Sequence, residues 1–365
     1  MKIAGIDIGG ANLKFALIDA GLSSGAVSVD QPTTTSFGPN VESTGEVSFP
    51  FWTDHLNLVA TLNQIRKPWP DIDGVAITMT AELADCFETK RQGVHFIVDA
   101  VRRAFPQTDC RFYTTKGELV DANLAKQNWA LTAASNWHAS AWHLFRQHKL
   151  TDGFLIDIGS TTCDLIPVEA GLPVAPGQTD LDRLRNGQLV YAGVGRTAIC
   201  SLIDSVQLAD GKVAVARERF ATVTDAMIWT ARKAPQRNNS DSTDSADGRP
   251  LTRSACRARL CRMLCADDED LQDAQVTAIA EQTNTALENQ IVTSLRSVVD
   301  QHPKLAKTFC LAGSGQSLAR CAINRVLANQ PQPTIIGTAN PNQTGQAIPA
   351  IAVAMKWLTE AARKQ

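Results

Sequence analysis

Two short segments of the chain place an aspartate just before glycines and small polar residues. Their candidate phosphate-binding residues are Gly9, Gly10, Asn12, Gly159, Ser160, Thr161 and Thr162. Glycine lets backbone N–H groups approach phosphate oxygens closely, and successive N–H groups form a nest that binds anions. Asp7 and Asp157 end expected strands, where a carboxylate can bind Mg²⁺ directly or through its waters. Each segment alone also fits an ordinary tight hairpin. The pair predicts a clamp for a metal-bound polyphosphate.

A third glycine turn follows the apolar run 309–312 and precedes an expected helix. Gly313 and Gly315 flank a serine there, and such a turn admits a nucleotide or another flat group against the backbone. The N-terminus of the following helix favours negative charge. The alternative is structural, because a strand-to-helix turn needs glycine in any case. We include both glycines among the phosphate-binding candidates, and Lys14 as a positive charge near the first segment.

The elements that must position these residues alternate between strand-like and helical patterns, which is typical of α/β folds. Residues 3–8 with 12–18, and later 154–168, are expected to form strand–turn–strand units around the two aspartate segments. Further strands are expected at 74–79 and 308–312. Helices are expected near 55–66, 93–104, 121–148, 224–232, from 254, and at 270–299.

An internal repeat indicates how the chain is divided. The sequences IDIGGANLKFALI, from Ile6, and IDIGSTTCDLIPV, from Ile156, share their first four residues and a strand–turn–strand pattern. A repeat at the start of each half predicts two lobes of related topology. We place the first lobe at residues 1–150 and the second at 151–365, with a closing helix at about 345–360. The polar, proline-bounded stretch at about 234–250 is expected to be a mobile loop, because it can bury little apolar surface.

The composition of the chain indicates its cellular compartment and the kinds of partner that it binds. The 365 residues are 44% hydrophobic and 20% charged, with a net charge of -2, as in ordinary soluble proteins. That charge gives no bulk attraction to nucleic acid or membrane, so we expect neither as a partner. Nine cysteines without CxxC pairs, and the lack of signal-peptide or membrane-spanning patterns, favour a reducing cytoplasm. A homo-oligomer stays open.

The three glycine segments, in this order, resemble the actin, sugar-kinase and heat-shock ATPase superfamily. IDIGGANLK is similar to its first phosphate motif, IDIGSTTCD to its second and LAGSGQS to its adenosine motif. Residues 345–354 resemble its second connecting helix. The resemblance implies a two-lobed, actin-like (ribonuclease H-like) α/β fold, with the closing helix packed toward a cleft between the lobes.

A finer resemblance narrows the family. GSTTCDLIP is similar to the hairpin of the hydantoinase A/oxoprolinase branch. DIGGANLK, TAELADCF, DIGSTTCDLIP and YAGVGRT together resemble a small subfamily linked to tetrahydromethanopterin-dependent one-carbon transfer. One archaeal member, the methanofuran-biosynthesis synthase, joins an aminomethylfuran-methyl diphosphate to the phenol oxygen of glutamyl-tyramine and releases pyrophosphate. Relatives often carry proline where this chain has Ala198, so the resemblance does not predict the backbone conformation just after YAGVGRT.

This resemblance implies an ether-forming transferase with a small-molecule diphosphate and a phenolic acceptor as substrates. Asp7 and Asp157 would hold Mg²⁺, and the glycine and hydroxyl residues would hold the diphosphate. A phenol with a pKa near 10 needs a base, and Glu82 or Asp85, in the turn after a buried strand, is the candidate. The alternative for Glu82 is a charge at a helix N-terminus. Lys14 completes the catalytic candidates.

Two other functions stay open on the sequence. One is an ATP-dependent small-molecule kinase or a hydantoinase/oxoprolinase-like amide hydrolase, although the chain is far shorter than a full oxoprolinase. The other is a non-catalytic, nucleotide-dependent regulator of the actin-like type.

Overall fold

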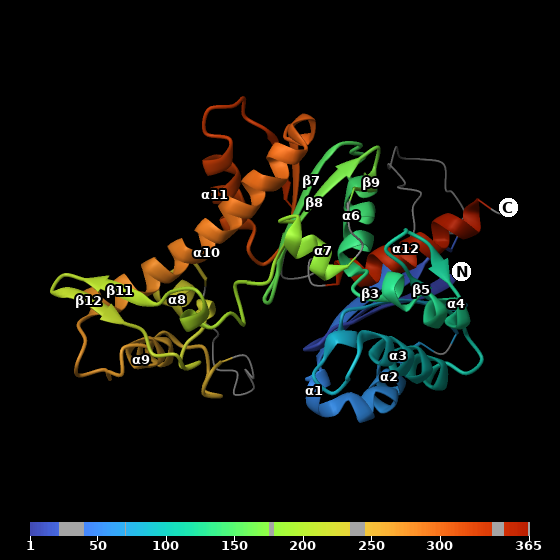
Figure 1. The fold of residues 1–365 in the computed structure, drawn as a ribbon. Coiled ribbons are helices and arrows are strands. Elements are labelled where there is room, and N and C mark those ends of the chain that lie inside the picture. Colours follow the sequence, from blue (N-terminus) through green and yellow to red (C-terminus); the bar gives the residue numbers. More distant parts are fainter. Residues whose placement is uncertain (22–39, 70, 175–178, 234–244, 338–346, 364–365) are drawn as a thin grey trace, which may run out of the picture. The chain divides into compact units, whose positions relative to one another are not determined.

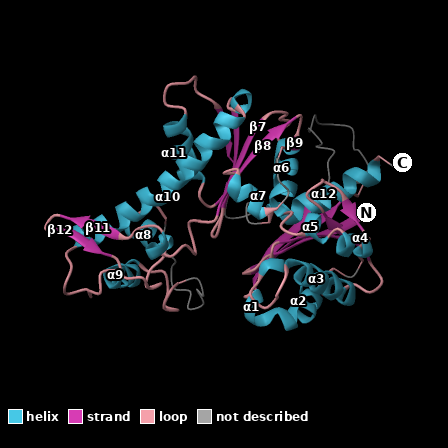
Figure 2. Cartoon of the chain, viewed as in Figure 1, coloured by secondary structure: helices cyan, strands magenta, loops and turns pink. Residues whose placement is uncertain are grey.

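The computed structural model describes residues 1–21, 40–69, 71–174, 179–233, 245–337 and 347–363. Within them the chain is mixed α/β, as predicted, and forms two compact units (Figures 1 and 2). Unit 1 comprises Met1–Asp152, Val168–Asp182 and Asn340–Gln365, and unit 2 comprises Gly153–Pro167 and Arg183–Ala339. The C-terminal helix therefore groups with unit 1, whereas the sequence-based division places it with the second lobe.

Unit 1 is built on a six-stranded sheet with the order β3–β2–β1–β4–β5–β6. Its strands are β1 (Lys2–Ile8), β2 (Asn12–Asp19), β3 (Asn40–Ser48), β4 (Gly74–Met79), β5 (Asp109–Tyr113) and β6 (Leu119–Val120). β1 pairs antiparallel with β2 and parallel with β4. Because side chains alternate between the faces of a strand, β1 places Ile6 and Ile8 in one core cluster and Ile3 in another. β1 is thus the central, two-sided strand of this sheet.

Helices cover both faces of this sheet (Figure 1). They are α1 (Phe51–Asp54), α2 (Leu58–Arg66), α3 (Lys90–Ala104), α4 (Ala122–Gln127), α5 (Trp129–Thr132), α6 (Asn136–Gln147) and α12 (Ile348–Ala362), with 3-10 turns η1 (His55–Asn57) and η2 (Ala81–Leu83). α2 and α3 pack in the cluster that contains Ile6, and α6 and α12 pack in the cluster that contains Ile3.

Glycine at position 5 sets how closely α12 approaches β1. A Cβ atom built at Gly5 would lie 1.8 Å from the carbonyl oxygen of Ala350. α12 contacts β1, β2 and β4, and its buried face includes Ala350 and Ala354. Any larger residue at position 5 would push the helix away from the strand that carries Asp7.

The sheet of unit 2 has the order β10–β8–β7–β13–β14, and β9 pairs with the end of β8. Its strands are β7 (Gly153–Ile158), β8 (Cys163–Glu169), β10 (Leu189–Val190), β13 (Thr308–Gly313) and β14 (Thr334–Gly337). The short β9 (Leu172–Pro173) and the end of β8 with which it pairs are grouped with unit 1. Apolar residues of β7, β8 and β13 form one core cluster with α10 (Asp273–Gln301) and α11 (Gln316–Val326). The remaining short elements are α7 (Asp180–Arg185) and the 3-10 turns η3 (Ile199–Ser201) and η4 (Pro303–Leu305).

A small hairpin in unit 2, shown with its neighbouring helices in Figure 2, contributes to a separate core cluster. Its elements are β11 (Ser205–Leu208), β12 (Gly211–Ala214), α8 (Val223–Trp229), α9 (Arg253–Arg262) and the first turns of α10. α8 begins with a capping box, in which Thr222 and Asp225 satisfy each other's backbone N–H groups.

The expected elements are found close to their predicted bounds, with one exception. Residues 121–148, expected as one helical stretch, form α4, α5 and α6 instead. The chain leaves the helical conformation at Ala133, which is extended, and at Ala134, whose φ is +46°. Ser135 then bonds to the Thr78 hydroxyl at 2.9 Å and to the Tyr113 carbonyl at 3.1 Å. Tertiary contacts to the sheet thus override local helix propensity.

Candidate active site

The first aspartate segment forms the turn between β1 and β2. In their register, Asp7 lies opposite Lys14 and Ile8 lies opposite Leu13. Gly9 N donates to the carbonyl of Asn12 at 3.0 Å, which closes the turn. A Cβ atom at Gly9 would lie 2.8 Å from that same carbonyl, so only glycine fits there. A Cβ atom at Gly10 would meet no heavy atom within 4 Å.

Two turn carbonyls anchor this hairpin to the core of unit 1. Gly10 O accepts from Phe51 N at 3.0 Å, and Ala11 O accepts from Phe49 N at 2.8 Å. Phe49 and Phe51 are themselves buried in the core cluster of α2 and α3. The carbonyls of Gly10 and Ala11 therefore accept hydrogen bonds from the protein and hold the turn in one place. A fixed turn of this kind suits a site at which backbone N–H groups bind an anion.

Asp7 is buried at the end of β1, with 4% of its surface exposed. Among the described residues its Oδ1 atom has no hydrogen-bond partner. Burial raises the pKa of Asp7 to about 6, the charge of Lys14 lowers it and that of Glu46 raises it. A buried carboxylate oxygen without a partner is costly unless a further group completes it.

A Mg²⁺ ion fits this chemistry. The described residues contain no cluster of three or more His, Cys, Asp or Glu side chains suited to a metal. Mg²⁺ at phosphate sites typically takes one or two carboxylates and completes its shell with phosphate oxygens and water. Asp7 Oδ1 could serve as one such ligand in unit 1.

Glu82 lies at the same end of the sheet as Asp7. Thr80 N donates to Ile8 O at 2.9 Å, so the chain leaving β4 passes the end of β1 before it reaches η2. A Cβ atom at Gly93 would lie 2.3 Å from Glu82 O, so α3 packs tightly against η2. Glu82 is 1% exposed, whereas Asp85 is exposed.

The environment of Glu82 favours its protonated form. Burial raises the pKa of the Glu82 carboxyl to about 8, and the charge of Asp180 adds to the rise. Its own backbone, Lys90 and the backbone N–H of Ala134 lower this pKa by smaller amounts. Glu82 Oε2 has no hydrogen-bond partner among the described residues. The left-handed backbone of Ala134, beside this carboxyl, is the kind of strain that gathers at functional sites.

The second aspartate segment forms the turn between β7 and β8 in unit 2. Gly159 N donates to the carbonyl of Thr162 at 2.9 Å, which repeats the bond of the first turn. Ser160 is exposed, and Thr161 and Thr162 are half-buried. The hydroxyls of Ser160 and Thr161 lie 3.4 Å apart, within hydrogen-bond distance, and Asp157 at the end of β7 is half-buried.

Gly313 and Gly315 lie directly against this second turn. A Cβ atom at Gly313, where φ is +74°, would lie 2.5 Å from Asp157 Oδ1 and 2.3 Å from Ile158 O. Gly315 N donates to Ile158 O at 3.0 Å. A Cβ atom at Gly315 would lie 2.3 Å from the Ile158 side chain, so packing requires glycine at both positions, which is the structural alternative. Gly313 also borders the Asp157 carboxylate.

A support for the second turn was missed by the sequence reasoning. Gly193 and Gly195, in YAGVGRT, pack so closely that a Cβ at either would lie 2.5–2.7 Å from atoms of residues 159–161. Val194 N donates to Gly159 O at 3.0 Å, and Gly195 N to Ser160 O at 3.0 Å. The available signal was the G-x-G spacing in YAGVGRT, a segment already noted for its resemblance to the subfamily. Arg196 N also donates to Ser160 O, at 2.8 Å.

Residues at matching positions of the two hairpins, Lys14 and Asp164, differ in role. Lys14 lies between Asp7 and Glu46 in the strand registers, so it balances two carboxylates. Asp164 forms an ion pair with the buried Arg183, which makes it a structural partner.

The structure thus brings the candidates together in two sets, each within one unit. Unit 1 holds Asp7, Gly9, Gly10, Asn12, Lys14, Glu82 and Asp85, and unit 2 holds Asp157, Gly159, Ser160, Thr161, Thr162, Gly313 and Gly315. Among the described helices, none is long and apolar enough to span a membrane.

Comparison with solved structures defines the fold class. The chain aligns with a nucleotide-free structure of acetone carboxylase with a TM-score of 0.57 and 9% identity, over 97% of this chain and 70% of that one. The two α/β units and their paired hairpins have the actin-like ATPase fold predicted from the sequence.

Sequence comparison defines the family. Residues 73–329 match the hydantoinase/oxoprolinase family, Hydantoinase_A. The chain is 32% identical, over 89% of both proteins, to (4-{4-[2-(gamma-L-glutamylamino)ethyl]phenoxymethyl}furan-2-yl)methanamine synthase of Methanocaldococcus jannaschii. A synthase of the same name from Methanococcus vannielii is 28% identical over 47% of this chain and 75% of the relative. The chain belongs to the hydantoinase/oxoprolinase family, and it is an enzyme of that family.

Proposed function

We propose that this enzyme forms an aryl ether in the biosynthesis of a methanofuran-type cofactor. It joins an (aminomethyl)furan-methyl diphosphate to the phenol oxygen of a tyramine-type or tyrosine-type acceptor and releases pyrophosphate. The observation that carries this proposal is the match to the M. jannaschii synthase, 32% identity across 89% of both chains. The relative's name contains the phenoxymethyl-furan linkage that such a reaction makes.

The reaction exchanges one C–O bond for another. The bond between the furanylmethyl carbon and the diphosphate oxygen breaks, and its electron pair leaves with pyrophosphate. The phenol oxygen bonds to the same carbon, and the phenol proton passes to a base. Negative charge grows on the leaving diphosphate, so preorganised N–H and hydroxyl donors around it lower the barrier. The turns at residues 9–12 and 159–162 supply donors of this kind.

Asp7 and Asp157 are the proposed carboxylate ligands for Mg²⁺. When bound, the ion neutralises charge on the diphosphate and makes it a better leaving group. The unpartnered Oδ1 of Asp7 supports this assignment, because binding a cation would complete its interactions. Burial raises the pKa of Asp7 to about 6, so below that pH protons compete with the cation for this carboxylate.

Glu82 is the proposed base for the phenol. A base with a pKa near 8 accepts a phenol proton far better than an ordinary carboxylate with a pKa near 4. Glu82→Gln should lower turnover by about 10²-fold or more, the usual contribution of general-base catalysis. Wild-type turnover should rise as the pH approaches 8, and the variant should lack that rise. Asp85→Asn is the comparison, since a larger loss from that exposed carboxyl would make Asp85 the base.

The decisive experiment is a direct assay of ether formation. Purified protein, Mg²⁺, the furan-methyl diphosphate and a glutamyl-tyramine acceptor are incubated without nucleotide, and the product is followed by mass spectrometry. We expect one equivalent of pyrophosphate for each ether formed, and competitive inhibition by added pyrophosphate against the diphosphate substrate. Failure to form ether with folded protein would contradict the proposal.

The family match favours one alternative, an ATP-dependent kinase or an amide hydrolase of the hydantoinase/oxoprolinase kind. It predicts ATP consumption that depends on a small acceptor. Parallel incubations with ATP in place of the furan diphosphate separate the two functions.

A further inference from the structure

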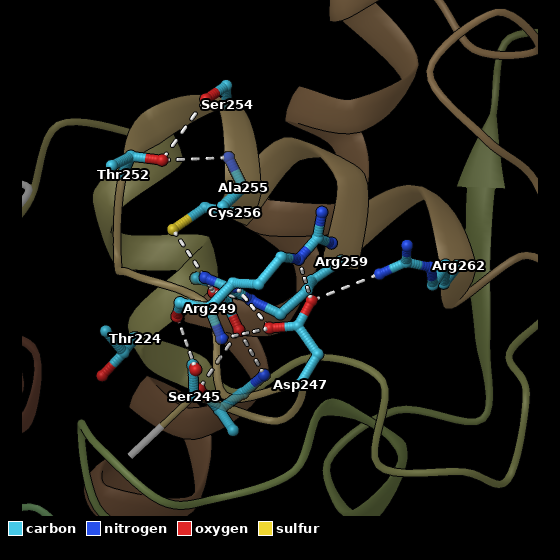
Figure 3. Close-up of polar contacts among 12 residues, drawn as sticks. Thr224, Ser245, Asp247, Arg249, Thr252, Ser254, Ala255, Cys256, Arg259 and Arg262 are labelled. Carbon is cyan, nitrogen blue, oxygen red and sulfur yellow. Dashed lines mark hydrogen bonds and ion pairs between the residues drawn. The ribbon is translucent and has the colours of Figure 1, made fainter. Parts of the chain in front are cut away.

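The last residues of the stretch at about 234–250, which was expected to be mobile, are anchored in unit 2 by an ion network (Figure 3). Residues 234–244 lie outside the described chain, but 245–250 form a turn around Asp247. Asp247 accepts from three arginines, Arg249 at 2.6 Å, Arg259 at 2.9 Å and Arg262 at 3.4 Å. Burial raises the pKa of Asp247, but the bonds from Arg249 and the charge of Arg259 outweigh it and lower this pKa to about 2.

Arg259 carries this network into the core. Its side chain is fully buried, and it forms a second ion pair at 2.8 Å with Asp225, which is also fully buried. Arg259 Nη2 further contacts the sulfur of Cys256 at 3.4 Å. Replacing such a pair by apolar residues is often neutral or stabilising, so stability alone accounts poorly for it. A buried pair is better explained where it fixes one geometry.

The geometry that it fixes is the first turn of α8. Asp225 Oδ2 accepts from the backbone N–H of Thr222 at 2.8 Å, while Oδ1 binds Arg259. The neighbouring residue, Thr224, is buried, and its hydroxyl donates to the carbonyl of Val194 at 2.8 Å. One helical turn therefore connects the ion network to the loop at residues 192–197.

That loop in turn holds the second phosphate-binding turn. Val194 N donates to Gly159 O, and Gly195 N donates to Ser160 O, both at 3.0 Å. Val194 therefore links the two elements, because its carbonyl accepts from the Thr224 hydroxyl and its N–H donates to the Gly159 carbonyl. The path from Arg259 to Gly159 is continuous and lies wholly within unit 2.

We propose that Arg259, Asp225 and Thr224 are positioning residues for the turn at residues 159–162. They do not touch substrate; they hold the loop that sets the direction of the turn's backbone N–H groups. The inference rests on the proposed function only in that the turn binds the phosphates of the substrate. The inference gives a role to residues 245–250 and to the arginine-rich helix α9, neither of which takes part in the proposed binding of the diphosphate.

Thr224→Val is the sharpest variant, because it keeps the side-chain volume and removes the hydroxyl that bonds to Val194. Thr283→Val is the matched control. Thr283 is likewise buried in unit 2, and its hydroxyl donates at 2.8 Å, but to Ile279 O of its own helix. Each variant loses one buried hydrogen bond of 2.8 Å, and Thr224→Val also loses a weaker bond of 3.4 Å to the carbonyl of Gly195. Both of the bonds lost in Thr224→Val reach the loop at residues 192–197, and the bond lost in Thr283→Val does not.

Amide hydrogen exchange tests the positioning without reference to function. Peptides that cover residues 158–163 should exchange faster in Thr224→Val than in wild type, by about threefold to tenfold for one lost hydrogen bond. Thr283→Val should leave the exchange of these peptides at the wild-type rate. Equal exchange in both variants would overturn the inference, whatever the reaction.

Binding of Mg²⁺-pyrophosphate, measured by calorimetry, tests the consequence for the site. Thr224→Val should weaken it by about threefold to tenfold, and Thr283→Val should not, even if the two variants lose the same thermal stability. If wild type binds Mg²⁺-ATP and not pyrophosphate, the proposed function fails, and the same comparison is made with Mg²⁺-ATP. Wild type that binds neither would overturn both proposals.

Arg259→Lys extends the test to the ion network. Lysine keeps the charge but cannot bridge Asp225 and Asp247 as the planar guanidinium does. It should weaken pyrophosphate binding, and the double variant with Thr224→Val should lose less than the two single losses combined. Losses that multiply fully would show that Arg259 does not act through Thr224. If Arg259→Lys fails to fold, the Thr224 and Thr283 pair still decides the matter.

Discussion

The two aspartate hairpins begin with the same four residues, yet the protein surrounds them differently. In the first, Asp7 is 4% exposed, and its Oδ1 lacks a partner among the described residues. In the second, Asp157 is half-buried and borders Gly313. The first turn is fixed by its own carbonyls, which bond to the segment at residues 49–51. The second turn is fixed by a separate glycine loop, which packs on it from residues 193–195.

This difference shows that the repeated sequence specifies the turn and that the surroundings specify the chemistry of its aspartate. Both turns are closed by a bond from the first glycine N–H to the carbonyl three residues later, at 3.0 Å and 2.9 Å. Burial raises the pKa of the Asp7 carboxyl to about 6, and Asp7 is 4% exposed whereas Asp157 is half-buried. We therefore expect the first hairpin to be the more sensitive to charge and the second to be the more sensitive to packing.

The largest expected effect comes from Asp7→Asn. Loss of the proposed metal ligand should lower turnover by about 10³-fold or more, as for removal of a key electrostatic group. The same variant should be more heat-stable than wild type at pH 7 in EDTA. Since the folded pKa is raised, wild type loses stability as the pH rises from about 4 through 6, and asparagine does not.

Thermal melts from pH 4 to pH 8 check this sign. The advantage of the variant should grow with pH and level off above about 7. Asp19→Asn is the control, because Asp19 is partly exposed and lies at the opposite end of β2 from the turn. It should neither lower turnover nor make the protein more heat-stable than wild type. A less stable Asp7→Asn protein at pH 7 would mean that the carboxylate has a structural partner.

Packing sensitivity is expected in the second hairpin. A Cβ atom at Gly193 would lie 2.5 Å from Gly159 O and 2.6 Å from Thr161 N, which are backbone atoms that cannot rotate away. Gly193→Ala should therefore lower the free energy of unfolding by about 1–3 kcal/mol. Gly10→Ala, in the first turn, meets nothing within 4 Å and should leave that free energy nearly unchanged.

Urea unfolding measures both changes, and an inhibition assay with pyrophosphate completes the contrast. Gly10→Ala should weaken inhibition despite its intact fold, because the methyl group enters space that the proposed phosphate needs. Equal stability losses in the two variants would remove the distinction between the hairpins.

What the sequence predicted well is local. The two hairpins, β4, α3 and β13 follow from runs of apolar residues, glycine turns and helical spacing, all of which act over a few residues. The actin-like fold class followed from the order of the three glycine segments. The site residues stay predictions, but each lies at the strand end or turn where its pattern placed it.

What the sequence did not predict depends on contacts between distant residues. Helix propensity favoured an unbroken stretch through Ala134, but Ser135 bonds to Thr78, far away in the sequence. Asp247 fell inside the stretch expected to be mobile, because the local sequence does not indicate that Arg259, twelve residues later, is its partner. For the same reason the sequence did not predict the hydrogen bond from Thr224 to Val194, which connects α8 to the loop at residues 192–197.

The smallest expected effect distinguishes Lys14 from its counterpart Asp164. Lys14 lowers the pKa of Asp7, so Lys14→Met should raise that pKa and move the acid side of the pH–rate profile to higher pH, by less than about one unit. Asp164, in the hairpin of unit 2, forms an ion pair with the buried Arg183, and Asp164→Asn removes that carboxylate. This variant should lower the melting temperature, because a buried guanidinium loses the pair, and it should leave the pH profile unmoved. Profiles of kcat/KM from pH 5 to pH 9 and melting curves of both variants make the comparison. If Asp164→Asn also moves the acid side of the profile, the charge of the second hairpin contributes to that titration, and the contrast drawn between the two hairpins fails.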